Sequence, residues 1–450
     1  MRTHERAISR PPGPRGLRGK RTVLAARRDP LGFLLSLAHE YGDVAFFSAG
    51  PFNAYLLSHP DHIRDVLVTH NAKFMKGQGI QEMKRLLGEG LLTSEGQIHK
   101  RQRRLIQPMF HHKRIEGYGD TMVEHALRLS DTWKDAQAID VHQEMMRLTL
   151  WIVAKTLFDT DVEEARTRQV AEALGTVLEL FDRLTSPLFV LLSRFGYSPE
   201  DRRFRDARET LDRMIYGMIE ERRRTGDRGD LLSTLLLAQE EGGEPMSDLQ
   251  VRDEAMTIFL AGHETTSNAL TWTWYLLSQH PDVEARLHEE LDSVLGDRPP
   301  TVADLPSLRY TERVLSESMR LYPPAWIVGR RALEDHQIDG YTIPAGSIVV
   351  ASEYIVHHDP RWFPDPYRFD PDRWLPERVA LRPKFSYFPF GGGQRLCIGE
   401  PFAWMEGELL LATIAQRWKL RLVRGHRVAL SPVVTLRPKY GMQMTAARRR

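Results

Sequence analysis

Phe388-Pro-Phe-Gly-Gly-Gly-Gln-Arg-Leu-Cys-Ile-Gly-Glu-Pro-Phe402 is the stretch from which the fold can be predicted. It contains Cys397, the only cysteine among 450 residues. A single cysteine excludes an intrachain disulfide and a zinc site built from several cysteines. One thiolate can still serve as an axial ligand of a haem iron, and glycines let the backbone pass close to a flat macrocycle. A helix predicted over residues 403–420 would begin just after the cysteine and stabilise its thiolate.

This stretch resembles the haem-binding signature of the cytochrome P-450 monooxygenases. Phe390, Gly393, Arg395, Cys397 and Gly399 stand at the defining positions of that signature. The resemblance implies haem b, with Cys397 as the ligand of the iron and Phe390, Arg395 and Gly399 as further cofactor contacts. The alternative is a structural cysteine in a glycine loop, because free cysteine is usually a small buried hydrophobe. The complete signature favours the haem ligand.

The resemblance extends over residues 30–437. It implies a fold that is mainly α with a smaller β portion (α+β), the cytochrome P-450 fold, as a single domain around a buried haem. We therefore expect the haem-thiolate monooxygenase domain at 30–450 and a basic, proline-containing leader at 1–29. Residues 1–28 carry nine Lys or Arg and one acid. Such a segment is usually solvated, and contact with a membrane surface or a partner is the alternative.

The composition is that of an ordinary globular protein, with 42% hydrophobic and 27% charged residues. The net charge of +2 does not call for a nucleic-acid partner. No apolar run reaches about 18 residues, so we expect no transmembrane anchor. A cleavable signal peptide is not evident either. Microsomal members of the resembled family have an apolar anchor before a proline-rich hinge, and this chain has a similar hinge without such an anchor. The resemblance therefore implies a cytoplasmic protein of the soluble bacterial type.

A second informative stretch is a long helix predicted from Asp248 to Gln279. Ser247 can cap its first turn, and Pro281 stops it. Glycine, threonine and serine at residues 261–267 are weak helix formers in the middle of this helix. Their hydroxyls can compete for backbone carbonyls and open the helix locally.

The family carries an acid–alcohol pair at this point of the helix. By resemblance, Glu264 and Thr265 are the catalytic pair that relays protons during dioxygen activation, with Ala261 beside the cofactor. An ion pair within the fold is the alternative role for Glu264.

A basic run predicts contacts with the haem propionates. In the family, His or Trp followed four residues later by Arg has this role, and here His99 and Arg103 share one face of a predicted helix. Arg330 resembles another propionate arginine, and Arg331 is the adjacent alternative. The alternative is that this run forms a basic helix face exposed to solvent, as charge runs usually do. Three of its side chains are expected to face outward and attract an acidic electron donor: Lys100, Arg101 and Arg104.

A structural ion-pair cluster is also implied by the resemblance. Glu317 and Arg320 lie one turn apart on a helix predicted over residues 310–321, a spacing that alone describes a common surface pair. The family joins this pair to an arginine of a later segment, which is Arg373 here. Trp374 departs from the pattern, since the family has phenylalanine at that position.

The β portion is predicted as a hairpin over residues 43–58, a strand over 325–331, a hairpin turn over 340–346 and strands within 420–444. An apolar run at 186–192 is core or the lining of a substrate entrance. The candidate substrate contacts are Phe74, Ala261, Trp326, Ile327 and Thr435.

The reaction implied by the resemblance inserts one oxygen atom of O2 into an apolar substrate. The electrons come from NAD(P)H through a separate ferredoxin or flavodoxin with its reductase. A peroxide-driven enzyme of the same fold and a non-catalytic haem sensor are the alternatives, and the intact pair Glu264 and Thr265 argues against both. The runs 321–327 and 91–94 resemble those of members that act on long apolar molecules. We therefore expect a long-chain lipid, fatty acid, terpenoid or carotenoid as substrate.

Overall fold

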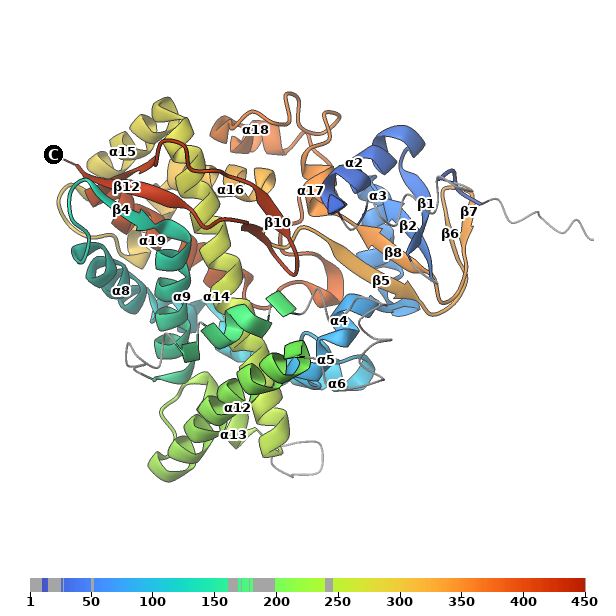
Figure 1. Cartoon of the computed structure of the whole chain (residues 1–450), viewed down its shortest axis with the longest axis horizontal. Coiled ribbons are helices and arrows are strands. Elements are labelled where there is room, and N and C mark those ends of the chain that lie inside the picture. Colours follow the sequence, from blue (N-terminus) through green and yellow to red (C-terminus); the bar gives the residue numbers. More distant parts are fainter. Residues whose placement is uncertain are drawn as a thin grey trace, which may run out of the picture. The chain divides into compact units, whose positions relative to one another are not determined.

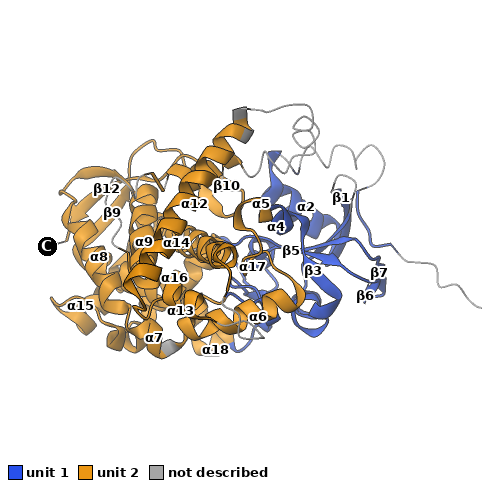
Figure 2. Ribbon diagram, turned by 90° about the horizontal axis from the view of Figure 1, so that it is seen from below, with its two compact units in different colours: residues 1–82, 325–368, 380–397 blue, residues 83–324, 369–379, 398–450 orange. Residues whose placement is uncertain are grey.

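The structure is a computed structural model. It describes residues 10–14, 26, 28–49, 52–160, 169–170, 172–177, 179–180, 199–238 and 246–449. The apolar run 186–192 lies outside the described residues. Figure 2 shows the two compact units that the chain forms. Unit 1 comprises residues 1–82, 325–368 and 380–397, and unit 2 comprises 83–324, 369–379 and 398–450.

Unit 1 contains most of the strands. Its elements, in chain order, are α2 (Pro30–Tyr41), β1 (Val44–Ala49), β2 (Phe52–Leu57), α3 (Pro60–Arg64), η1 (Asp65–Thr69), η2 (Asn71–Lys73), β3 (Phe74–Lys76), α4 (Gln78–Glu82), β5 (Val328–Ala332), β6 (His336–Ile338), β7 (Tyr341–Ile343), β8 (Ile348–Ala351), α17 (Glu353–His357), η6 (Lys384–Ser386) and η7 (Gly393–Arg395).

A five-stranded sheet in the order β1-β2-β8-β5-β3 organises unit 1. The predicted hairpin is confirmed, since β1 and β2 pair antiparallel with Val44 opposite Leu57. β2 and β8 pair parallel. Buried side chains from the sheet, α3 and η1 form one apolar core, which includes Val44, Leu57 and Ile63.

The structure shifts two predicted elements of unit 1, one strand and one hairpin turn. The strand expected over 325–331 begins at Val328, because the carbonyl oxygen of Trp326 accepts a hydrogen bond from the Ser352 hydroxyl at 2.7 Å. The hairpin turn expected over 340–346 lies earlier, between β6 and β7. Its central residues, Asp339 and Gly340, have φ of 50° and 76°, the positive values that a tight hairpin turn requires.

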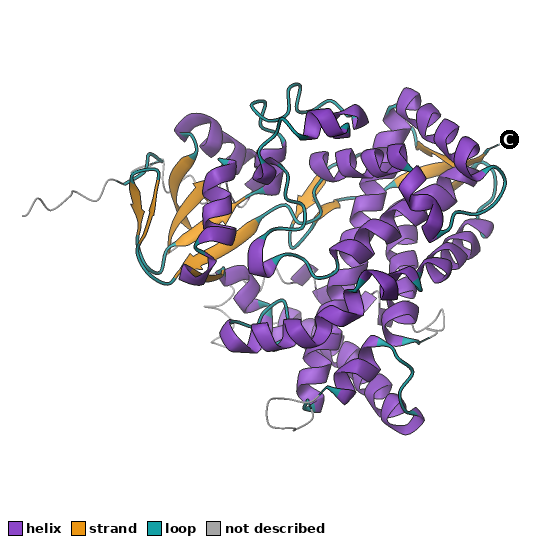
Figure 3. Cartoon of the chain, turned by 180° about the vertical axis from the view of Figure 1, so that it is seen from behind, coloured by secondary structure: helices purple, strands orange, loops and turns teal. Residues whose placement is uncertain are grey.

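Unit 2 is predominantly helical. Figure 3 shows the helices and strands of the described chain in different colours. Its elements, in chain order, are α5 (Lys84–Leu87), α6 (Gly96–Ile106), η3 (Gln107–Phe110), α7 (His112–Glu116), α8 (Gly119–Asp131), β4 (Gln137–Asp140), α9 (Val141–Phe158), α12 (Pro199–Thr225), α13 (Leu231–Leu237), α14 (Asp248–Gln279), α15 (Pro281–Leu295), η4 (Val302–Ser307), α16 (Arg309–Leu321), η5 (Pro371–Trp374), α18 (Pro376–Val379), α19 (Glu400–Arg417), β9 (Trp418–Leu422), β10 (Leu430–Pro432), β11 (Leu436–Pro438) and β12 (Gln443–Arg448).

The helix α14 runs through unit 2, as Figure 1 shows, and its bounds are those predicted from the sequence. The Ser247 hydroxyl accepts a hydrogen bond from the Gln250 N–H at 3.2 Å, which confirms the expected cap. Helices α9, α12, α16 and α19 pack against α14. The Trp272 side chain is fully buried, and its indole N–H donates to the carbonyl oxygen of Leu436 at 2.9 Å.

The helix after the cysteine begins and ends earlier than predicted, at Glu400 and Arg417 rather than over 403–420. Pro401 is tolerated in its first turn because the first N–H groups of a helix have no intrahelical partner. Residues 418–422 form β9, which pairs with β12 instead of continuing the helix. Within the described residues, no helix combines the length and apolarity needed to cross a membrane.

A buried carboxylate joins α16 to η5 in unit 2. Arg320 donates to both oxygens of Glu317 at 2.8 Å, and both side chains are 0% exposed. Arg373 forms an ion pair with Glu317 at 3.2 Å. The indole N–H of Trp374 donates to Glu317 at 3.0 Å, which a phenylalanine could not do. The Asp370 N–H also donates to the carboxylate, at 3.1 Å.

We expect Glu317→Gln to lower the free energy of unfolding by about 3–5 kcal/mol, because it leaves buried arginines without a compensating charge. Denaturant unfolding of the full chain measures this change. Glu312→Gln on the same helix is the matched control, since Glu312 is half exposed and pairs with Arg309 at 3.6 Å. Its effect should stay within about 0.5 kcal/mol. Equal effects of the two substitutions would contradict a structural role for Glu317.

Candidate active site

The loop that carries Cys397 belongs to unit 1 and is closed by backbone hydrogen bonds. The Cys397 N–H donates to the carbonyl oxygen of Phe390 at 3.0 Å, and the Gly391 N–H donates to that of Phe388 at 2.8 Å. Cys397 is exposed, whereas free cysteine is usually buried. A loop closed by its own backbone and holding an accessible cysteine fits the expected ligand of a haem iron.

Two positions of this loop require glycine for different structural reasons. Gly393 has a φ of 66°, and a Cβ there would lie 2.0 Å from the carbonyl oxygen of Leu67 in η1. Gly391 has a φ of 74° with no atom within 4 Å of the position of a Cβ. Gly393 therefore allows the loop to pack against η1, whereas Gly391 only allows the turn. Phe390 and Arg395 are half-buried in the same loop.

The middle of α14, in unit 2, is open on one side. Residues 251–260 and 266–274 are buried throughout, but Ala261 is exposed and Thr265 is half-buried. The Thr265 hydroxyl donates to the carbonyl oxygen of Ala261 at 2.8 Å, within the same turn. Gly262 lets α9 approach, because a Cβ there would lie 3.0 Å from the Val153 side chain. An open strip on an otherwise buried helix fits the expected contact with a flat cofactor.

Glu264 lies on a buried face of α14, where it meets a residue far away in sequence. Its Oε1 accepts a hydrogen bond from the Thr435 hydroxyl at 2.6 Å, and the Asn268 amide donates to the same hydroxyl at 3.1 Å. Burial raises the pKa of Glu264, and the hydrogen bond from Thr435 opposes this shift. The carboxyl thus retains its proton at higher pH than a solvated glutamate.

The predicted substrate contact Thr435 is thus a hydrogen-bond partner of the predicted catalytic acid. The hydroxyl of Thr265 instead bonds to its own helix. Asn268, which is fully buried, was not singled out in the sequence, although it stands one turn after Glu264 on the same helix. That position was the available signal.

The expected propionate ligands on α6 lie on one side of the helix. His99 is 5% exposed and Arg103 is half-buried, whereas Lys100 and Arg104 are exposed. Arg101, expected to face outward, is half-buried.

Gln102 was missed by the sequence analysis, although it is the uncharged residue within the basic run of α6. It is fully buried and accepts a hydrogen bond from the Ser94 hydroxyl at 2.5 Å. Its amide donates to the carbonyl oxygen of Glu89 at 2.7 Å. Gln102 therefore fixes α6 to the preceding segment.

The remaining expected cofactor and pocket residues of unit 1 lie on or next to the sheet. Arg330 is half-buried and Arg331 is exposed. Glu353, not singled out in the sequence, is completely buried; burial raises its pKa well above the usual range, and the charge of Arg330 opposes this shift. Phe74 belongs to the apolar core. Trp326 is buried and Ile327 half-buried, just before β5.

Comparison with known proteins places the chain in a class. The sequence model of the family described as Cytochrome P-450 matches residues 11–444, and the chain belongs to this family. It is a haem-thiolate monooxygenase. Haem is the cofactor that the family implies.

Several bacterial relatives are similar over most of their length. The chain is 42% identical over 428 residues to cyclooctatin synthase of Streptomyces melanosporofaciens, covering 94% of this chain and 92% of the relative. It is 40% identical over 406 residues to cyclooctat-9-en-7-ol 5-monooxygenase of the same species, with coverages of 90% and 88%. Pentalenene oxygenase of Streptomyces avermitilis is 38% identical over 414 residues, with coverages of 91% and 89%.

A solved structure shares the fold. The structure of retinoic-acid-bound cyanobacterial CYP120A1 is similar to this chain with a TM-score of 0.87 and 25% sequence identity. The similarity covers 98% of this chain and 100% of the other. The predicted fold, mainly helical with a smaller β portion, is confirmed.

We expect Gly393→Ala to reduce the fraction of protein that shows the carbon monoxide spectrum of thiolate-ligated haem, because the new Cβ would collide with the Leu67 carbonyl. The measurement is the reduced carbon monoxide difference spectrum per mole of purified chain. Gly391→Ala is the control, since it carries the same backbone strain without a collision. Similar losses in both variants would show that strain, rather than packing on η1, sets the tolerance of the loop.

Proposed function

We propose that Cys397 is the thiolate ligand of haem b and that the protein hydroxylates a terpenoid with O2 and electrons from NAD(P)H. The observation that carries the assignment is the exposed cysteine in a loop closed by its own backbone. When bound, the haem supplies the activation of dioxygen. The protein residues position the cofactor, exclude water and supply protons.

The acid Glu264 has the environment that a proton carrier needs. It is buried and its pKa is raised, so its carboxyl can hold a proton and pass it to a neighbouring hydroxyl. The hydrogen bond from Thr435 orients the carboxyl, and the Asn268 amide in turn donates to the Thr435 hydroxyl. Thr265, on the open strip of α14, is the alcohol that faces the reacting molecules in this proposal.

The haem propionates would be bound by His99 and Arg103 of α6 and by Arg330 of β5. Arginine suits this role because its guanidinium stays charged and donates several N–H groups in a fixed plane. His99 itself is buried.

The substrate class follows from the relatives. Their names include cyclooctat-9-en-7-ol and pentalenene, and the similar solved structure holds retinoic acid. These molecules are isoprenoid and largely apolar. We infer that this chain oxidises a cyclic terpene or terpene alcohol, in preference to a fatty acid. Ala261, Trp326 and Ile327 are the side chains we assign to its contact surface.

The electron donor is proposed to be an acidic ferredoxin or flavodoxin that docks on α6. Lys100 and Arg104 are exposed there, on the helix that also carries His99 and Arg103. Cationic side chains steer an acidic partner to the surface and raise its association rate.

A reconstituted assay with a panel of cyclic terpenes tests the reaction. We expect product with O2, NAD(P)H, ferredoxin and reductase, and little with peroxide alone. Glu264→Gln should lower kcat of the NAD(P)H reaction roughly 100-fold, because it removes the proton donor while keeping shape. Glu408→Gln, another buried acid with a raised pKa, is the matched control and should leave kcat unchanged. Undiminished turnover of Glu264→Gln, or equal product from peroxide, would overturn the mechanism.

Reversal of the charge at Lys100 and Arg104 tests the docking surface. The double substitution to glutamate should slow electron transfer from ferredoxin about 10-fold at low salt, with the difference shrinking at high salt. Stopped-flow reduction of the ferric protein measures the rate. Lys134→Glu, an exposed lysine elsewhere in unit 2, serves as the control. A rate that does not respond to the double reversal places the donor elsewhere.

A further inference from the structure

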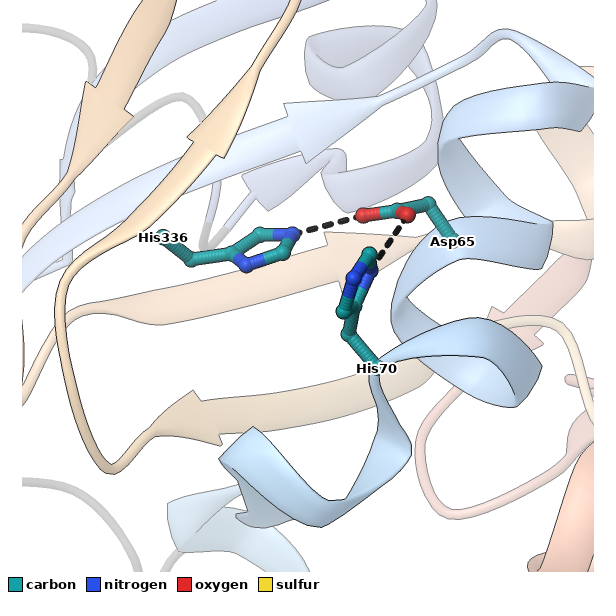
Figure 4. Close-up of side chains that lie close together, drawn as sticks. All are labelled: Asp65, His70 and His336. Carbon is teal, nitrogen blue, oxygen red and sulfur yellow. Dashed lines mark hydrogen bonds and ion pairs between the residues drawn. The ribbon is translucent and has the colours of Figure 1, made fainter.

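Unit 1 contains a cluster of metal-ligating side chains that the proposed reaction does not use. Figure 4 shows the imidazoles of His70 and His336 directed at the carboxylate of Asp65. The Nδ1 of His70 lies 2.6 Å from Oδ1, and the Nε2 of His336 lies 2.6 Å from Oδ2. One ligand atom from each of the three residues lies within 4.8 Å of the others.

An unusual backbone turn creates this cluster. The segment η1 (Asp65–Thr69) is a π-helix, and the His70 N–H donates to the carbonyl oxygen of Asp65 at 2.8 Å, five residues back. In an α-helix, residues five apart point about 140° away from each other. The wider π turn brings Asp65 and His70 onto one face. Such turns are rare and are found frequently at functional sites.

The third residue comes from a distant part of the sequence. His336 is the first residue of β6 and is 4% exposed, whereas the side chains of Asp65 and His70 are 27% and 41% exposed. The ring of Phe74 packs edge-on against His336 at 5.1 Å and holds it in place. The site is therefore rigid on its buried side and reachable from solvent at His70.

We propose that Asp65, His70 and His336 bind a divalent transition metal, with Zn²⁺ as the ion whose chemistry fits. Two imidazole nitrogens and one carboxylate oxygen are a common zinc ligand set, and a water molecule completes a tetrahedral shell. Calcium and magnesium are disfavoured because they prefer oxygen ligands. The site is distinct from Cys397, which belongs to the haem loop.

Metal binding requires a small change from the hydrogen-bonded arrangement. The nitrogens that donate to Asp65 must present lone pairs instead, so each neutral imidazole moves its proton to its other nitrogen. For the histidine bonded to the ligating oxygen, the nitrogen–oxygen distance must widen from 2.6 Å to about 3.3 Å, the spacing of ligands in a tetrahedral shell of about 2.0 Å. The other ligand atoms, which lie within 4.8 Å of one another, must take up the same spacing. A change of this size lies within the range of side-chain rotation.

The nearby charges do not oppose a cation. Lys73 follows the π turn, but its ammonium is paired with Glu334 at 2.9 Å. Among the three proposed ligands, Asp65 supplies a negative charge. The negative charge of Asp65 therefore favours a cation at the cluster.

Calorimetric titration of the chelator-treated full chain with Zn²⁺ tests the proposal. We expect one ion per chain, and at least a 100-fold loss of affinity in Asp65→Asn, His70→Asn and His336→Gln. His59→Asn is the matched control, because His59 lies 3.7 Å from a carboxylate oxygen of Asp61 in the same unit. Asparagine preserves its role as a helix cap, so the affinity of this variant should be unchanged.

A measurement on the unsubstituted chain guards against variants that fail to fold. Co²⁺ in place of Zn²⁺ should give the visible absorption of a tetrahedral site with nitrogen and oxygen ligands, and Zn²⁺ should abolish it. Absence of one-to-one binding, or full affinity in all three ligand variants, would overturn the proposed metal site. The cluster would then be a carboxylate that accepts hydrogen bonds from two histidines. Because the readout does not involve haem or turnover, its failure leaves the proposed monooxygenase function untouched.

Discussion

Unit 2 depends on the burial of α14, a helix of 32 residues that carries charged side chains into the core. Each buried charge needs a partner, because its transfer from water is otherwise costly. Arg252 donates to the carbonyl oxygen of Leu86 at 2.7 Å and to Asp212 at 2.7 Å. Glu254 accepts from the Leu91 N–H at 2.9 Å. These bonds fix neighbouring segments to the helix. In the middle of the helix, Ala261 is exposed.

Buried acids also make the stability of unit 2 depend on pH. Burial raises the pKa of Glu406 to about 8, and burial together with the charge of Glu312 raises that of Glu408 to about 8. In the unfolded chain both titrate near 4.5. The folded chain therefore binds these protons more tightly, and the stability they contribute is present at low pH and lost as the pH rises from about 4.5 toward about 8. The helix α19, which follows the loop of Cys397 in sequence, carries both groups.

Local signals predicted much of the fold. A serine cap and a following proline define the ends of α14, and alternating apolar residues define the hairpin of β1 and β2. The chemistry of the candidate site followed from the signature around Cys397 and from Glu264, and family membership supports that interpretation. Roles of individual side chains remain predictions.

Contacts between distant residues could not be predicted in the same way. Glu264 bonds to Thr435, which is 171 residues away, and no periodicity in the sequence connects them. Trp374 looked like a departure from a pattern until its indole was found on Glu317. The π turn at Asp65 depends on a hydrogen bond between residues five apart in the sequence. Helix propensity indicates whether a residue is helical, but not whether the turn is an α or a π turn.

The packing of Gly393 on Leu67 has a consequence for biosynthesis. Gly393 lies 326 residues after Leu67 in the sequence, so Leu67 is synthesised well before it. During synthesis the surface of η1 lacks its covering loop until those further residues have been translated. A nascent chain that ends before Gly393 therefore leaves that surface of η1 uncovered.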